Sequence, residues 1–132
     1  IIDCPPALSL LTVNAFSASR YVFVPVQCEY MALEGLTELL SSIQMVRDNL
    51  NPQLALGGII MTMFDSRTTL SKEVVNEVRN HFPETFKTVI PRNVRVAEAP
   101  SHGKTMLEYA PTSPAAKAYA DVAEEMLLRL RR

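Results

Sequence analysis

The sequence predicts an α/β fold, in which a doubly wound, mostly parallel sheet carries helices on both of its faces. Three observations predict it. Short apolar runs alternate four times with longer stretches whose apolar residues recur at helical spacing. The run Tyr21–Val26 is continuously apolar, which is typical of a strand buried on both faces, and Leu54–Phe64 is the next strand. Proline-containing turns separate several of these segments.

The first third of the chain predicts two strands and two helices. Two β-branched residues run into Asp3 and a pair of prolines, which indicates a strand ending at Ile2. A short helix is expected over Ala7–Ala18, and a strand over Tyr21–Val26. A long amphipathic helix is then expected over Met31–Leu50, and Asn51-Pro52 ends it. The inner faces of the two helices are expected to hold Leu8, Leu11 and Ala15, and then Leu33, Leu36, Leu40, Ile43 and Leu50.

The remaining elements follow the same alternation. A strand over Leu54–Phe64 precedes a helix over Leu70–Phe82, and a short strand over Thr85–Ile90 ends at Pro91. Residues 92–104 are polar and irregular, with one helical turn expected near Val94–Glu98.

The last helix has a clear starting signal. Ser113 is a favourable N-cap, and Pro114 suits the first helical position, so a helix is predicted over Ala115 to about Arg131. Its inner stripe is expected to be Tyr119, Val122, Ala123, Met126 and Leu130.

Connections between parallel strands are right-handed, so the carboxyl ends of the strands face the same way. The loops after Ile2, Val26, Phe64 and Ile90 should therefore gather at one edge of the sheet. Ligands of open α/β sheets bind at this edge, so the chemistry is expected there.

Composition narrows the function classes. Thirteen basic and fourteen acidic residues give a net charge of −1, so nucleic acid binding would need a local basic patch. No apolar run reaches the ~18 residues of a membrane span, and no signal peptide is visible. Cys4 and Cys28 lack the spacing of a zinc site or disulfide framework, and both are expected to be buried thiols.

Several sequence blocks resemble the ParA/Soj branch of the ParA–MinD ATPases. They occur in order between residue 1 and about residue 125: residues 1–6 (IIDCPP), 25–30 (PVQCEY), 32–36 (ALEGL), 62–68 (TMFDSRT), 88–95 (TVIPRNVR) and 98–104 (EAPSHGK). The resemblance implies a P-loop NTPase fold and an ATPase that dimerises around two ATP molecules. Such a dimer binds double-stranded DNA non-specifically, is stimulated by a ParB-type partner, and partitions chromosomes or plasmids on the nucleoid in the cytoplasm.

The sequence departs from the family pattern in one respect. It holds no glycine-rich phosphate loop with its lysines, and no segment for the aspartate that positions the attacking water. We therefore expect residues 1–132 to belong to a single domain. They would form the C-terminal portion of a ParA-type ATPase domain. The chain begins at an apolar strand that needs neighbours, which also predicts a missing N-terminal part. No catalytic residue is assigned, and the chain alone is expected neither to bind ATP well nor to hydrolyse it.

The resemblance assigns residues at the sheet edge to nucleotide and Mg²⁺. Asp3 corresponds to the Walker B acid that orders Mg²⁺ through water, while a turn residue is the alternative. Gln27 and Glu29 are expected near the dimer interface and nucleotide, with helix capping as an alternative for Glu29. The adenine pocket is expected at Thr62, Met63, Pro91, Arg92 and Asn93, although the last three could also be an ordinary turn.

The DNA-binding candidates are Arg67 and Arg95, followed by Lys104 and Arg92. Both leading arginines are expected in loops. Lys72 and Arg79 are instead expected on a solvated helix face of mixed charge, because acidic residues lie between them in the sequence. Lacking a recognition helix, the surface should contact phosphates without sequence preference.

Two alternative functions remain. The last helix carries leucines and arginines near its end, which could anchor a MinD-like ATPase to a membrane. Packing of this helix on the sheet is favoured, and no membrane contact is expected. The chain could also be a non-catalytic binding remnant.

Overall fold

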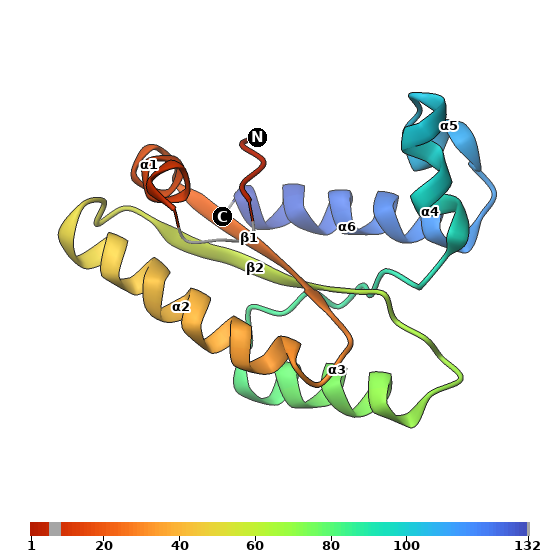
Figure 1. The fold of residues 1–132 in the computed structure, drawn as a ribbon, viewed down its shortest axis with the longest axis horizontal. Coiled ribbons are helices and arrows are strands. Elements are labelled where there is room, and N and C mark those ends of the chain that lie inside the picture. The colour runs from red at the N-terminus through yellow and green to blue at the C-terminus, as the bar shows by residue number, and fades with distance from the viewer. Residues whose placement is uncertain (6–8, 132) are drawn as a thin grey trace.

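The computed structural model describes residues 1–5 and 9–131 of the chain. It confirms the α/β class, with helices on both faces of a parallel sheet (Figure 1). The elements in chain order are α1 (Leu10–Ala18), β1 (Tyr21–Gln27), α2 (Ala32–Asn49), β2 (Ala55–Thr62), α3 (Thr69–His81), α4 (Val94–Glu98), the 3₁₀ helix η1 (Ala99–His102), α5 (Met106–Tyr109) and α6 (Pro114–Leu130).

Strands β1 and β2 form a parallel pair, with Val24 opposite Ile59 and Gln27 opposite Thr62. The register shifts between Val22 and Phe23, where β2 carries one extra residue. In Figure 1, α2 and α3 lie on one side of the strands and α6 lies on the other. The doubly wound arrangement predicted from the alternating pattern is therefore present around these two strands.

The predicted strand Thr85–Ile90 is not a regular strand. It follows the other edge of β2, where the Phe86 amide donates to the Ile59 carbonyl at 2.8 Å and the Ile90 amide donates to the Met61 carbonyl at 2.9 Å. The two donors are four positions apart on this segment, whereas their two acceptors are only two positions apart on β2. The ladder between them is therefore interrupted. We call residues 85–90 the edge segment. At the interruption a carboxylate of α6 accepts from the amides of Lys87 and Thr88, and the Thr88 amide is the one that a regular ladder to β2 would use.

The predicted strand at Ile1–Ile2 is wrong for this structure. Both isoleucines are exposed, and residues 1–5 have no helix or strand assignment. A parallel strand is held by its backbone ladder to a neighbour, and among the described residues 1–5 and 9–131 no backbone hydrogen bond joins this segment to β1 or β2. Pro6, Ala7 and Leu8 lie outside the described residues, so the predicted helix is seen from Leu10 onward.

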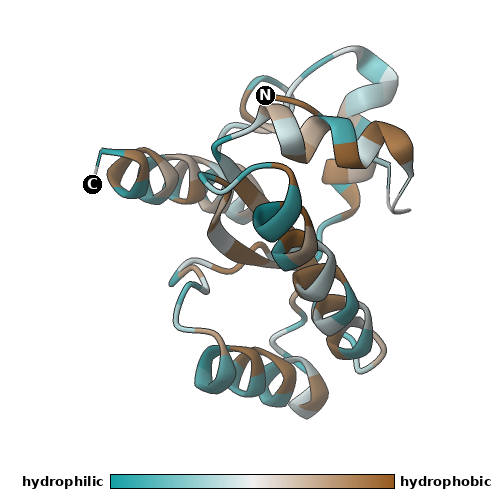
Figure 2. Cartoon of the chain, turned by 90° about the vertical axis from the view of Figure 1, so that its left-hand side faces the viewer, coloured by the Kyte–Doolittle hydropathy of each residue, from teal (hydrophilic) through white to brown (hydrophobic). Residues whose placement is uncertain are grey.

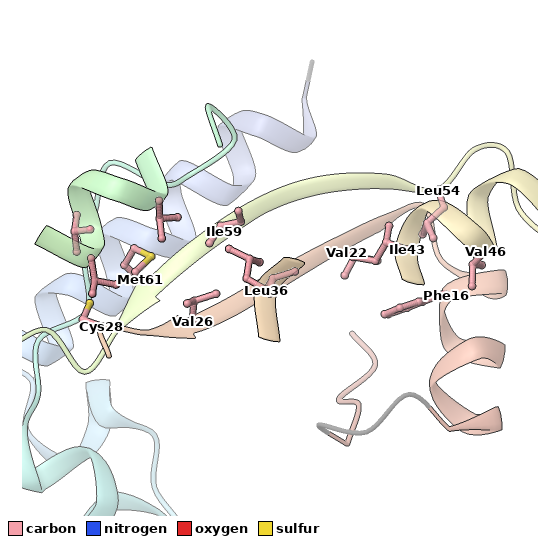
Figure 3. Close-up of a cluster of buried hydrophobic side chains, with 14 residues drawn as sticks. Phe16, Val22, Val26, Cys28, Leu36, Ile43, Val46, Leu54, Ile59 and Met61 are labelled. Carbon is pink, nitrogen blue, oxygen red and sulfur yellow. The ribbon is translucent and has the colours of Figure 1, made fainter. Parts of the chain in front are cut away.

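The larger part of the core lies between the strands and the helices α1, α2 and α3 (Figure 3). Alternate residues of β1, among them Val22 and Val26, meet Ile59 and Met61 of β2 on this face. A smaller cluster on the opposite face joins Ile60 and Phe86 to α6. The helices show brown and teal segments alternating along their length in Figure 2, as amphipathic helices do.

The predicted inner faces of α1 and α2 are confirmed in part, since Ala15, Leu36 and Ile43 are buried and Leu33 and Leu40 pack against the core. In α1 the buried residues are Thr12, Ala15 and Phe16, while Leu11 is exposed. In α2, Val46 is buried and Leu50 is exposed. Leu11 lies one position before the buried Thr12 and faces solvent, and Leu50 is the C-cap that follows the last residue of α2, so it lies beyond the helical face that holds Val46 in the core.

The buried face of α6 differs most from its prediction. Val122 is buried and Met126 packs against it as predicted, but Tyr119, Ala123 and Leu130 are exposed. The other buried residues of α6 are Ala115, Ala116 and Ala118. Ala115 and Ala116 cluster with Met106 and Ala110. These small side chains let the start of α6 approach α5 closely, so volume rather than hydrophobicity decides this face. The predicted caps are confirmed, since the Ser113 hydroxyl accepts from the Ala116 amide and Pro114 is the first helical residue.

Candidate functional site

The carboxyl ends of β1, β2 and the edge segment meet at one edge of the sheet. The Cys28 amide donates to the Thr62 carbonyl at 2.9 Å, which joins the first two ends. The Phe64 amide donates to the Ile90 carbonyl at 3.1 Å, and the Arg92 amide donates to the Phe64 carbonyl at 2.9 Å. Three of the four predicted loops therefore gather as expected, while the loop after Ile2 is not joined to them by backbone hydrogen bonds in the described residues.

The residues predicted for the adenine pocket lie together at this edge. Thr62 ends β2, and its hydroxyl donates to the Val26 carbonyl at 3.2 Å. Met63 follows with a φ of 56°, a left-handed backbone unusual for a methionine, and its side chain is 37% exposed. Phe64 is bridged to Pro91. A strained, half-exposed residue beside two strand ends is a common feature of functional sites.

Asn93 has a structural role of its own. Its side-chain oxygen accepts from the Arg95 amide at 3.0 Å and caps α4. The cap uses the side-chain oxygen of Asn93, and the side-chain nitrogen Nδ2 takes no part in it. Both the turn interpretation and a base contact through the nitrogen are therefore compatible with this geometry.

Asp3 lies in the exposed N-terminal segment, apart from the helices and strands. Within residues 1–5 and 9–131 no group of three or more His, Cys, Asp or Glu side chains could hold a metal ion. A Mg²⁺ ion near Asp3 would thus have at most two such side chains, which suits a cation bound mainly by water and phosphates.

Gln27 and Glu29 flank the turn that leaves β1. Gln27 is exposed opposite Thr62, and the Glu29 amide donates to the Gln27 carbonyl at 2.8 Å. No side-chain cap is made at Met31, the N-cap of α2. Because Gln27 is paired with Thr62, the exposed Gln27 and Glu29 side chains lie at the same edge of the sheet as Thr62.

Arg67 is exposed but held in a bidentate ion pair. Its Nε donates to Asp65 Oδ1 at 2.9 Å and its Nη2 donates to Asp65 Oδ2 at 2.7 Å, while its side chain is 85% exposed. The hydrogen bonds from the Arg67 side chain and amide hold the pKa of Asp65 well below its usual range. The guanidinium thus projects into solvent in a fixed orientation.

The helical turn expected near Val94–Glu98 is confirmed as α4, so the expectation that Arg95 lies in a loop is wrong. The cap from Asn93 explains this, because it starts a helical turn directly after the edge segment. Arg95 and Lys104 are both exposed, on either side of η1. Arg92 precedes them and is also exposed.

Cys28 is buried, and burial raises the pKa of its thiol to about 11 despite the opposing effect of Arg79. A thiol with so little thiolate is a poor nucleophile and metal ligand. Cys4 is only partly buried, against expectation. Among the described helices, none is long and apolar enough to cross a membrane.

Comparison with known proteins confirms the resemblance. Residues 1–56 match a family described as "AAA domain". The "Sporulation initiation inhibitor protein Soj" of Bacillus subtilis is 53% identical over 127 residues, which cover 96% of this chain and 50% of that protein. The "Chromosome-partitioning ATPase Soj" of Thermus thermophilus is 54% identical over 132 residues, covering 99% and 53%. This chain is a homologue of the Soj and ParA chromosome-partitioning proteins.

The similarity includes relatives that carry the ParA name. The "Chromosome partitioning protein ParA" of Caulobacter vibrioides is 51% identical over 132 residues, which cover 99% of this chain and 49% of that protein. This Soj/ParA homologue spans about half the length of the curated relatives it matches.

A solved structure shows the same fold. Cobyrinic acid a,c-diamide synthase from Mycobacterium smegmatis, crystallised with bound ADP and magnesium, matches with a TM-score of 0.77 at 33% identity. The match covers 98% of this chain and 46% of that one. The α/β fold of this Soj/ParA homologue is therefore of the P-loop NTPase type.

Proposed function

We propose that this chain is the C-terminal portion of a ParA-type partition ATPase, which segregates chromosomes or plasmids in the cytoplasm on the nucleoid. The observation that carries the proposal is the identity of 51–54% over nearly the whole chain to proteins named for chromosome partitioning. The sheet edge that gathers Thr62, Pro91 and the exposed arginines supports it.

In this proposal the edge binds the base of ATP. Met63, Pro91 and the amide nitrogen of Asn93 offer an apolar surface with one polar donor, which fits a purine. Asp3 would order Mg²⁺ through water once phosphates are bound nearby. ATP with Mg²⁺ supplies the phosphoanhydride bond whose hydrolysis resets the protein.

The phosphates of ATP need groups that this sequence does not hold. No glycine-rich loop with a lysine occurs in it, and such a loop provides most of the affinity for nucleotide phosphates. Residues 1–132 alone should therefore bind ATP weakly and hydrolyse none, while the full-length gene product should do both.

DNA binding is proposed for Arg67, Arg95 and Lys104. All three are exposed and follow the ends of β2 and the edge segment. One copy offers few phosphate contacts, so its DNA affinity should be low. A homodimer formed on ATP, with Gln27 and Glu29 at or near its interface, doubles these contacts. A ParB-type partner would then stimulate hydrolysis and release.

The test is nucleotide binding and turnover by the full-length gene product that carries this chain. Wild-type protein should bind a fluorescent ATP analogue in the presence of Mg²⁺ and release phosphate, and Asn93→Ala should weaken binding. Lys117→Gln, an exposed change on α6, serves as the control. Failure of the full-length protein to bind nucleotide would overturn the proposal.

A second candidate function has one structural observation in its favour. Leu127, Leu128 and Leu130 near the end of α6 are 55%, 57% and 41% exposed, so the packing that argued against a membrane contact is incomplete. Co-sedimentation with anionic lipid vesicles tests this MinD-like alternative. Binding that is lost on Leu127→Gln/Leu128→Gln would favour it over the partition role.

A further inference from the structure

A shallow groove of about 370 Å³ runs between α3 and the edge segment. Lys72, Asn76 and Arg79 line it from the helix, and Lys87 lines it from the edge segment. The floor is apolar and consists of Phe64, Val75 and Val89. Three of the seven lining residues are basic and none is acidic, so the groove is a basic site in a chain whose net charge is −1.

Helical geometry creates this charge separation. Lys72, Asn76 and Arg79 are spaced by four and three residues, so they share one flank of α3. An α-helix turns by about 100° per residue, so Glu73 and Glu77 lie about 100° and 140° around the helix from Lys72. The face of mixed charge expected from the sequence is therefore divided into a basic flank toward the groove and an acidic flank away from it.

The walls of the groove are fixed by hydrogen bonds. Arg79 Nη2 donates to the Lys87 carbonyl at 2.6 Å and to the Phe86 carbonyl at 3.4 Å, which ties α3 to the edge segment. The Lys87 amide donates to the Glu125 carboxylate at 3.0 Å on the far side. The backbone that carries the Lys87 side chain is thus held from both sides before any ligand arrives, which lowers the cost of binding.

The two lysines are available for a ligand. In the described part of the chain the ion pairs are Arg67–Asp65, His81–Glu77 and Arg129–Glu125, and neither Lys72 nor Lys87 belongs to one. Both lysine side chains are exposed, so their ammonium groups are accessible to an anion from solvent. Lys72 lies in the first turn of α3, and Arg67 directly precedes Thr68, the N-cap of this helix, so Arg67 and the groove lie at the same end of α3.

We propose that this groove binds a phosphate of double-stranded DNA through Lys72 and Lys87, and extends the DNA surface at Arg67. The inference rests on the proposed DNA-binding function. Arg79 positions the groove by holding the Lys87 carbonyl, and the two ammonium groups contact the phosphate oxygens. Because these contacts read no base edge, they add affinity without sequence preference.

The experiment measures the salt dependence of DNA binding by the full-length gene product with ATP. The variants are Lys72→Gln, Lys87→Gln and their combination, with Lys117→Gln as the matched control because it removes the same charge from α6. Each lost phosphate contact should lower the slope of log K against log salt by about 0.9 per binding copy. The control should leave the slope unchanged, and competition with inorganic phosphate distinguishes a site for the free ion.

Three results would overturn the inference. If the double variant keeps the wild-type slope while Arg67→Glu reduces it, the groove inference fails and the proposed function stands. If free phosphate at low millimolar concentration protects Lys72 and Lys87 from acylation but DNA does not, the site belongs to the free ion. If wild-type protein binds no DNA with ATP, both the inference and the DNA-binding part of the proposed function fail.

Discussion

The guanidinium carbon of Arg129 lies 4.0 Å from the centroid of the Phe86 ring, so the end of α6 is stacked on the edge segment. The same guanidinium donates to the carbonyls of Glu84 and Thr85 and pairs with Glu125 at 2.8 Å. Glu125 in turn accepts from the amides of Lys87 and Thr88. These two side chains replace the strand that would otherwise satisfy this edge of the sheet.

Arg129→Met should destabilise the protein by about 2–4 kcal/mol, because several carbonyls lose a charged donor and the cation–π contact is lost. Urea unfolding monitored by circular dichroism gives the free energy of unfolding. Arg47→Met is the matched control, since Arg47 is exposed on α2, and it should cost under ~0.5 kcal/mol. Equal effects of the two substitutions would contradict the role of Arg129.

The Glu125 interactions predict a pH dependence of stability. Partial burial pushes the pKa of Glu125 upward, but hydrogen bonds from Lys87, Arg129 and Thr88 outweigh it, and the pKa lies below its usual 4.5. Ionised Glu125 therefore stabilises the folded state above pH ~4.5, and this contribution is lost as the pH falls through the lower folded-state value. Unfolding free energies of wild type and Glu125→Gln should differ at pH 7 and converge toward pH 3. A difference that grows on acidification would refute this assignment.

Gly58 has a φ of 154°, and a Cβ there would lie 2.3 Å from the Phe86 ring and 2.8 Å from Arg129. Gly58→Ala should therefore destabilise the protein by about 1–3 kcal/mol. Gly35→Ala is the opposite case, because a Cβ added at this position on α2 would have nothing within 4 Å, and it should stabilise by about 0.5–1 kcal/mol. Thermal unfolding of both variants checks the contrast, which would be wrong if both shifts had the same sign.

If Arg67 contacts DNA as proposed, Asp65 competes with DNA for its guanidinium. Since the carboxylate neutralises the guanidinium in a bidentate pair, Asp65→Asn should strengthen DNA binding by the full-length gene product, by roughly 3-fold or more at low salt. Fluorescence anisotropy with a duplex of arbitrary sequence measures the effect. Glu73→Gln, on α3, raises the net charge by the same amount and controls for the global change in charge. A larger gain for the control than for Asp65→Asn would contradict the competition.

Periodicity was sufficient to predict the main elements of the fold. The helices α2, α3 and α6 and the strand β1 lie within two residues of their predicted bounds, because long amphipathic patterns and buried apolar runs are strong local signals. The edge segment looked like a strand by the same criterion. Its ladder is broken by Glu125, thirty-eight residues away from Lys87, and a local pattern carries no information about such a contact.

The site was predictable in part. The positions of the strand ends in the sequence predicted that Thr62, Pro91 and the loop with Arg67 meet at one edge of the sheet, and the structure confirms this. The functional roles of these residues stay predictions. The left-handed backbone of Met63 had no local signal, because methionine rarely adopts it. The basic groove was also missed, since Lys72 and Arg79 alternate with acids in the sequence and separate from them only on the helix. A helical projection of α3 would have found that separation.

The most direct test of the central claim is the nucleotide dependence of DNA binding by the full-length gene product. Anisotropy of a labelled duplex of arbitrary sequence would be recorded with ATP and Mg²⁺, with ADP and Mg²⁺, and without nucleotide, for wild type and Arg67→Glu. A ParA-type partition ATPase predicts tight, salt-sensitive binding with ATP only, reduced at least ~10-fold by Arg67→Glu. Equal binding under all three conditions, or none with ATP, would contradict the assignment.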